Sequence, residues 1–449
     1  MTNKQLIFLI VLGFAIMPYS VQVTGEESVY TVMAYEMWFH GNWLSPTLYG
    51  EPYHRPPLIN WLIIGLCSVI GWENSIPAAR LVSAAATLSA GWLIFWFVNR
   101  CWKDRDLAWL ATLLYFGAWQ VLGGYGWKGY SDALFGALVL GSMIFAYLSI
   151  YERRLLWMLA AVCFAFLGFL TKAITAFVFL GVALIVWGVS LKAWRFLISP
   201  RILTIGVLAP VLILLWYQIS PTGERMASGM TEDVLDRLLI SNAGLFFDHL
   251  FRFVIETLLN FIPLTILLLW MYRKKRQTID WNTNAITFLF VAFLNFLPYW
   301  IFPMGHARYL MPLYGLVAIY LATVIYHDTD ATTFMRRLII GVIFFKLAFA
   351  IVLFPQYTKH FRPDIEEIAK NILHIAAGRK VYSVDETWIG ISVSDQINKR
   401  QYPQPPITSD YQGALEGLIY AHQLRNDLGT LVKNYDNRLF LYCVGSNCN

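Results

Sequence analysis

Apolar runs of membrane-spanning length recur along most of the chain, and they constrain its fold more than any other feature. Each run is roughly 16 to 22 residues long, and a bilayer core of about 30 Å requires about 20 such residues per helix. Charged residues make up only 14% of the 449 residues, whereas an ordinary soluble domain carries about 25%. A soluble protein with so many apolar runs would lack a polar surface. The sequence therefore predicts an all-α polytopic membrane protein.

The hydrophobic pattern predicts about eleven spans, at residues 5–20, 76–99, 107–122, 133–150, 155–170, 173–190, 202–219, 256–272, 284–302, 309–326 and 337–354. The first run is interpreted as a retained span, because no small-residue cleavage pattern follows it. A further apolar run, Pro56–Trp72, is short and follows a proline-rich segment. We expect it to lie in the interface rather than to cross the bilayer.

The distribution of basic residues tests this topology. If Lys4 is cytoplasmic, each connection on its side holds two to four Lys or Arg residues, namely those at 100–105, 152–154, 192–201, 273–276 and 327–337. The opposite connections hold about one apiece, which is the bias that cytoplasmic loops show. We expect the long loops and the C-terminal part of the chain to lie on the outer side.

Four segments follow from this topology. Residues 1–354 are predicted to form the membrane domain, with outer loops at 21–75 and 221–255, and residues 355–449 an extramembrane α/β domain. The second loop contains a helical pattern at Thr231–Ile240, which we expect to cover an outward-facing cavity as a flap.

The C-terminal segment has the pattern of a small soluble domain. A helical stretch precedes a β-like run at Val381–Val384, and another short strand is expected near the end of the chain. Cys443 and Cys448 lie five positions apart there, and an oxidising compartment would permit a bridge between them. The eight histidines show no metal-ligand spacing, so no metal ligand is assigned, and the use of a divalent metal is left open.

Few charges are expected at the outer membrane boundary, and ionisable groups there are functional candidates because an unpaired charge in lipid is costly. They are Glu26, Glu27, Glu36, Glu51, Arg55, Arg80, Lys128, Asp132, Lys172 and Arg308, together with the loop charges Glu224, Arg225, Glu232 and Asp233. A carboxylate can accept a proton from an attacking hydroxyl, and Arg or Lys can hold a phosphate as negative charge grows on it. A phosphate on a long lipid is a leaving group that such a site could reach. A transporter is the main alternative, although we find no internal repeat and the charges lie at one edge. Lys346, inside the last span, has no role in either interpretation.

The outer-boundary motifs occur in a recognisable order. They are Glu26-Glu27, Gly41 to Trp43, Pro46 to Tyr53, Arg55-Pro56-Pro57 and Trp61 in the first loop, then Ser131-Asp132-Ala133, Gly168 to Lys172 and Arg308 to Tyr314. Together they resemble the polyprenyl-phosphate-sugar glycosyltransferases with the GT-C fold. The bacterial lipid A 4-amino-4-deoxy-L-arabinose transferase and protein O-mannosyltransferase-like enzymes are members of this group.

The resemblance implies roles for individual residues. Glu26 occupies the place of the catalytic carboxylate, and Glu27, the second acid of the pair, is the other catalytic candidate. Arg55 occupies the place of the cation that contacts the lipid phosphate. Lys172 and Arg308 would complete the phosphate site. The further substrate-binding candidates are Tyr53, Asp132 and Lys128.

Two departures from the family pattern stand in the first loop. Glutamate occupies position 26, where aspartate is usual, and Val29 stands where the arabinose transferases often have an arginine.

The resemblance also implies the reaction and its partners. We expect an inverting transfer of a sugar from a polyprenyl phosphate to a lipid, glycan or protein acceptor, at the periplasmic face of a bacterial inner membrane. We expect no nucleic-acid partner. A transporter or flippase for a lipid-linked or anionic substrate is the alternative function.

Overall fold

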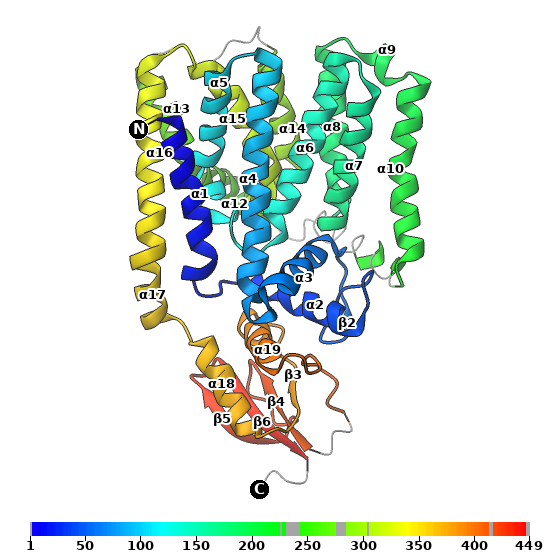
Figure 1. Ribbon diagram of the computed structural model, residues 1–449, viewed down its shortest axis with the longest axis vertical. Helices are drawn as coiled ribbons and strands as arrows, with labels where there is room; N and C mark the ends of the chain where they lie inside the picture. Colours follow the sequence, from blue (N-terminus) through cyan, green and yellow to red (C-terminus); the bar gives the residue numbers. More distant parts are fainter. Residues whose placement is uncertain are drawn as a thin grey trace.

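A computed structural model describes residues 2–221, 223–224, 227–229, 243–274, 284–302, 305–412 and 416–445. Most of them form a bundle of helices whose axes run roughly along the longest dimension of the molecule (Figure 1). The bundle contains α1 (Asn3–Ser20), α4 (Ser75–Trp102), α5 (Arg105–Gly117), α6 (Ser131–Glu152), α7 (Leu155–Thr171), α8 (Thr175–Ser190), α9 (Trp194–Leu197), α10 (Pro200–Ile219), α12 (Ala243–Asn260), α13 (Leu264–Arg273), α14 (Ile286–Ile301), α15 (Met311–Ile325), α16 (Thr329–Ala348) and α17 (Phe354–Phe361).

The helices follow the predicted apolar runs. Among the described residues, five helices are long and apolar enough to cross a membrane, or up to six if one bent pair counts as a single span, and others are apolar but shorter. The count of about eleven crossings stays a prediction. The span predicted at 256–272 is not one straight helix, because α12 ends at Asn260 and α13 starts at Leu264 with a bend of 94°. Pro263 stands at the break, where its missing N–H and its ring interrupt the helical hydrogen bonds.

The first loop folds into a compact unit at one end of the bundle (Figure 1). It contains α2 (Glu27–His40), a short hairpin of β1 (Thr47–Leu48) and β2 (Glu51–Pro52), and α3 (Leu58–Ile70). Glu36 of α2 is buried, and its carboxylate accepts hydrogen bonds from Thr47 Oγ1 at 2.6 Å, Tyr49 N at 2.7 Å and Gly50 N at 3.1 Å. This one side chain therefore fixes the hairpin on α2.

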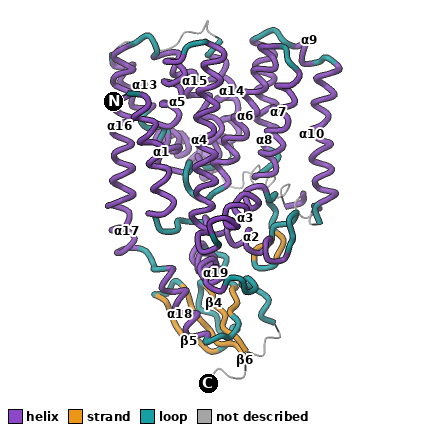
Figure 2. The backbone as a smooth tube through the Cα atoms, viewed as in Figure 1, coloured by secondary structure: helices purple, strands orange, loops and turns teal. Residues whose placement is uncertain are grey.

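The C-terminal segment forms a small α/β unit beyond the first loop, as the sequence predicted. Figure 2 shows the strands of this unit near the C-terminal end of the molecule. The unit contains α18 (Ile365–Ala376), β3 (Val381–Ser383), α19 (Trp388–Gln401), β4 (Glu416–Ala421), β5 (Thr430–Tyr435) and β6 (Leu439–Gly445). The sheet order is β3-β4-β6-β5, with β3 and β4 parallel and the other neighbours antiparallel. The domain boundary at residue 354 stays a prediction.

Two sequence predictions involve residues that the structure does not describe. Cys443 in β6 is disulfide-bonded, and its expected partner, Cys448, lies outside the described residues. The predicted flap helix at Thr231–Ile240 also lies outside them.

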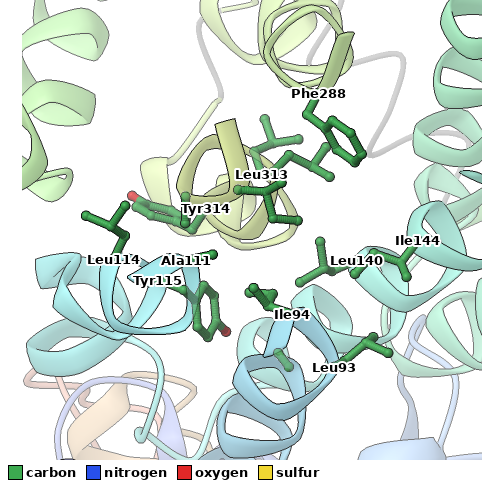
Figure 3. Close-up of a cluster of buried hydrophobic side chains, with 14 of the residues drawn as sticks. Leu93, Ile94, Ala111, Leu114, Tyr115, Leu140, Ile144, Phe288, Leu313 and Tyr314 are labelled. Carbon is green, nitrogen blue, oxygen red and sulfur yellow. The ribbon is translucent and has the colours of Figure 1, made fainter. Parts of the chain in front are cut away.

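Apolar side chains build two cores that hold the site. Figure 3 shows part of the bundle core, where Leu93, Ile94, Leu140 and Leu313 meet from α4, α6 and α15. A second core is shared by α2, α3, the N-terminal end of α4 and the C-terminal unit. Because the first loop and the C-terminal unit bury apolar surface against each other, their relative position is fixed by packing.

Candidate active site

A cavity of about 860 Å³ lies where the bundle, the first loop and the C-terminal unit meet. Its lining residues are Gly25, Glu26, Val29, Tyr30, Leu48, Tyr53, Arg55, Gln120, Tyr125, Tyr130, Asp132, Lys172, Glu256, Asn260, His306, Arg308, Glu386, Thr387, Trp388 and Ile391. Six of the eight residues selected from the sequence are in this set, and two, Glu27 and Lys128, are not. The catalytic and binding roles of all eight remain predictions.

Glu26 lies at the tight turn between α1 and α2. Gly25 precedes it with a φ of +59°, a conformation that glycine adopts without the steric cost of a side chain. The backbone N–H of Glu26 donates to the Tyr130 hydroxyl at 2.8 Å. The side chain is 62% exposed, and its Oε2 is 3.7 Å from Arg308 Nη1. This carboxylate is therefore accessible to a ligand while its backbone is held in place.

Glu27, only one residue later, has a different environment. It is fully buried and forms a two-pronged ion pair with Arg80, with Arg80 Nε 2.8 Å from Oε1 and Nη2 2.6 Å from Oε2. Thr24 N donates to the same carboxylate at 2.8 Å, and Gly129 N at 2.9 Å. Burial raises the pKa of Glu27, but Arg80 and these hydrogen bonds outweigh it, so the pKa is lowered overall. Both carboxylate oxygens are thus occupied away from the cavity.

Lys172 and Asp132 form a buried ion pair on the cavity wall. They come from the end of α7 and the first turn of α6, and their side chains are 11% and 3% exposed. The ammonium of Lys172 also lies 4.1 Å from the centre of the Tyr309 ring. Burial lowers the pKa of Lys172 to about 8, and the opposing attraction of Asp132 does not cancel this effect. Lys172 is therefore a cation that can lose its proton in mildly alkaline solution.

The guanidinium groups of Arg55 and Arg308 line the same cavity, and each has a hydrogen-bond donor that is unsatisfied within the described residues. The Nε atoms of Arg55 and Arg308 are buried and have no hydrogen-bond partner in the described part of the chain. Arg308 lies 5.6 Å from the Tyr125 ring and 5.5 Å from the Tyr130 ring, so aromatic faces hold it in place. Buried donors without acceptors are costly, and an anionic ligand in the cavity would supply acceptors for both.

The other two predicted binding residues differ in position. Tyr53 lines the cavity, and its ring stacks on His54 with centroids 4.8 Å apart. Lys128 lies behind the wall, with its ammonium 4.7 Å from the centre of the Tyr125 ring, and burial lowers its pKa. Lys128 thus supports an aromatic residue of the cavity rather than lining it.

Sequence reasoning missed several polar or aromatic residues of the lining, and three of them matter most for its chemistry. Glu256 comes from α12, and Glu386 and Trp388 come from the C-terminal unit. Glu256 stands at the edge of a predicted span, which is a usable signal for an ionisable group in a membrane protein. The C-terminal residues carry no such signal, because only the docking of their unit brings them to the cavity.

A resident metal site was left open by the sequence. Within the described ranges, no group of three or more His, Cys, Asp or Glu residues is arranged to hold a metal ion.

Comparisons with known proteins identify relatives of parts of the sequence. No protein-family model matches the chain. Over 98 residues, which are 22% of this chain and 18% of the relative, it is 32% identical to undecaprenyl phosphate-alpha-4-amino-4-deoxy-L-arabinose arabinosyl transferase of Aeromonas hydrophila subsp. hydrophila. Over 202 residues, which are 41% of this chain and 37% of the relative, it is 25% identical to arabinosyl transferase 1 of Proteus mirabilis. The matches thus cover less than two fifths of the length of these curated relatives.

Solved structures match almost the whole chain. The crystal structure of ArnT from Cupriavidus metallidurans bound to undecaprenyl phosphate has a TM-score of 0.75 at 14% identity, over 98% of this chain and 97% of that one. The apo state of the same protein has a TM-score of 0.69 at 15% identity, over 98% of each chain. The chain therefore has the ArnT fold, and the resemblance predicted from its motifs is confirmed.

Proposed function

We propose that this protein is an integral membrane glycosyltransferase. It moves a sugar, with inversion, from a polyprenyl phosphate of the undecaprenyl phosphate type to an acceptor, which is lipid A, another glycolipid or polysaccharide, or a protein. The cavity and the C-terminal unit would face the periplasm of a bacterial cell, with the bundle in the inner membrane. The observation that carries the proposal is one cavity that holds an accessible carboxylate and three cations, Arg55, Lys172 and Arg308.

The three cations form the proposed phosphate site. They lie where the apolar bundle meets the polar first loop, so a lipid tail could stay in the bilayer while its phosphate enters the cavity. Arg55 and Arg308 each bring a buried Nε without a partner, and planar guanidinium groups bind phosphate oxygens in pairs. Asp132 would keep Lys172 oriented through their ion pair.

Glu26 is the proposed base. Its carboxylate is exposed to the cavity, and its backbone is held by Tyr130. In the transfer, the oxygen of an acceptor hydroxyl attacks the anomeric carbon of the sugar, and the bond from that carbon to the phosphate oxygen breaks. The hydroxyl proton moves to Glu26, and undecaprenyl phosphate leaves with the bonding electrons. The cations stabilise the charge that grows on the departing phosphate.

Arg308 connects the two halves of the proposed site. Its guanidinium lies 3.7 Å from Glu26 Oε2 and also belongs to the phosphate-binding set. When a phosphate draws Arg308 toward itself, the Glu26 carboxylate is left free to accept a hydrogen bond from the acceptor hydroxyl. Donor binding would thus prepare the base.

The remaining predicted residues receive supporting roles. Glu27 is proposed to position Glu26 rather than to react, because both of its oxygens bind Arg80 and backbone groups. Tyr53 is proposed to contact the sugar from the cavity wall, and Lys128 to hold Tyr125.

A deletion strain tests the proposed function. Mass spectrometry of lipid A, envelope polysaccharides and proteins should show the loss of one sugar from a single class of acceptor, and the wild-type gene should restore it. The lipid-linked donor should accumulate on the periplasmic leaflet. Unchanged masses in all three fractions would contradict the proposal, and donor trapped on the cytoplasmic leaflet would support the transporter instead.

A further inference from the structure

The C-terminal unit forms one wall of the cavity. Glu386, Thr387, Trp388 and Ile391 all line it, and they belong to the start of α19 and the turn before it. The opposite side carries the cations of the proposed phosphate site, which come from the bundle and the first loop. All three cations of the lining thus lie on the side that meets the membrane helices, together with Glu26, Asp132 and Glu256, whereas the outer wall carries one carboxylate and an indole.

This outer wall is held rigidly. Asp385 Oδ1 accepts a hydrogen bond from Thr387 N at 2.8 Å, and the Tyr49 hydroxyl donates to the Asp385 carbonyl at 3.1 Å. Tyr49 belongs to the hairpin of the first loop, so the two units are joined at this turn. The Ser28 and Ser392 hydroxyls, from α2 and α19, are 3.1 Å apart. A wall fixed by packing and hydrogen bonds can orient a ligand at little entropic cost.

Glu386 and Trp388 have capacity to bind a ligand. Glu386 is exposed, and no ion pair joins it to a cation within the ranges that the structure describes. Trp388 is half-buried, and the described part of the chain offers no hydrogen-bond acceptor to its indole N–H and no second aromatic ring to its face. Arg362 lies 5.4 Å from the centre of this ring and holds it in place.

We propose that this wall is the acceptor subsite, and that Trp388 and Glu386 select a carbohydrate acceptor by binding an uncharged sugar ring. The inference rests on the proposed function, because it assumes that the cationic side of the cavity binds the donor phosphate. The reacting atom of the acceptor is then a sugar hydroxyl oxygen, whose proton passes to Glu26 in the transfer step described above.

The chemistry of the wall favours this class of acceptor. A carboxylate accepts hydrogen bonds from hydroxyl groups, and it repels a phosphate. An indole offers an apolar face to the C–H groups of a sugar ring and an N–H donor at its edge. A peptide acceptor would be expected to use backbone hydrogen bonds to a strand edge, whereas the wall is formed by a helix start and a turn.

Transfer kinetics of the purified full chain test the inference. The donor is the lipid-linked sugar extracted from the deletion strain, and the acceptor is the envelope glycolipid and polysaccharide extracted from the same strain, before and after removal of its phosphates. Trp388→Ala and Glu386→Gln are compared with Trp388→Phe, which keeps an aromatic face. Asp410→Asn is the matched control, because Asp410 is an exposed acid of the same unit that does not line the cavity.

We expect Trp388→Ala and Glu386→Gln each to raise the KM for the acceptor by about tenfold. Undecaprenyl phosphate binding should stay unchanged, Trp388→Phe should recover most of the loss, and the dephosphorylated acceptor should still be used. An unchanged acceptor KM in both variants, weakened undecaprenyl phosphate binding, loss of transfer on dephosphorylation, or sugar found only on protein would overturn the inference. If the wild-type chain neither binds undecaprenyl phosphate nor transfers sugar, the proposed function itself fails.

Discussion

The Glu27→Gln variant should unfold at a much lower denaturant concentration than the wild-type protein. The change leaves the guanidinium of Arg80 without a counter-charge, although only 1% of that side chain is exposed. Breaking a buried ion pair by removing one partner costs about 3–5 kcal/mol. The amide also turns an N–H₂ group toward donors from Arg80, Thr24 or Gly129, which adds an unsatisfied contact. We therefore expect the free energy of unfolding to fall by an amount at the upper end of this range.

A double substitution separates the charge effect from the loss of hydrogen bonds. Arg80→Gln in the Glu27→Gln background removes the uncompensated charge, so the double variant should be less destabilised than the sum of the two single variants. The coupling energy should be about 2–4 kcal/mol, since close buried pairs show strong interaction in such cycles. The double variant should still be less stable than the wild type, because Arg80 also donates to the carbonyls of Val21 and Gln22, and these hydrogen bonds are lost with its side chain.

The assay is unfolding of the full chain in mixed detergent micelles, followed by tryptophan fluorescence. Glu26→Gln serves as the control, because it changes the adjacent carboxyl in the same way at an exposed position. A Glu27→Gln variant whose free energy of unfolding lies within about 1 kcal/mol of the wild-type value would contradict this prediction. It would mean that the buried pair does not hold the turn that carries Glu26.

Three further predictions concern the same region. Undecaprenyl phosphate should bind less tightly as the pH rises through about 8, because burial lowers the pKa of Lys172 to about 8 and its ammonium loses the proton above that pH. In a binding titration, the affinity of Lys172→Arg should not fall over the same pH range. Gly25→Ala should lower the transfer rate about tenfold or more. A residue with a side chain is strained at a φ of +59°, and its Cβ would collide with the Tyr130 hydroxyl that holds Glu26. A wild-type transfer rate in this variant would contradict the prediction. Burial raises the pKa of Glu36 from 4.5 to about 7. The stability that this shift contributes is therefore fully present below pH 4.5 and is lost as the pH rises to about 7. Thermal unfolding of Glu36→Gln should depend less on pH across this window than that of the wild type, and an unchanged pH dependence would contradict the effect.

The sequence located much of the site because the relevant residues stand at the ends of apolar runs. Asp132 and Lys172 lie at the outer ends of the predicted spans, and helices that cross a membrane must bring such ends to the same face. Arg55 and Tyr53 lie in the first loop, which the predicted topology places on that same face. The predicted topology therefore placed these side chains on one face, and the motif resemblance grouped them into one candidate site.

Other features depend on contacts that leave no local pattern. Glu26 and Glu27 are identical and adjacent, and only the position of Arg80 on α4 decides which one is buried. Trp388 reaches the cavity because α19 packs on α2, more than 300 positions away in the sequence. The bend between α12 and α13 divides a run that reads as one span, since hydropathy does not report the direction of a helix.

The most direct test of the account is transfer by purified Glu26→Gln protein. Because Glu26 is exposed and its backbone contact to Tyr130 does not involve the side chain, the substitution should leave the unfolding transition and undecaprenyl phosphate binding intact. The transfer rate should fall by at least about a hundredfold, as expected when a general base is removed. Transfer at the wild-type rate, with the fold and lipid binding retained, would contradict the central claim that Glu26 accepts the proton.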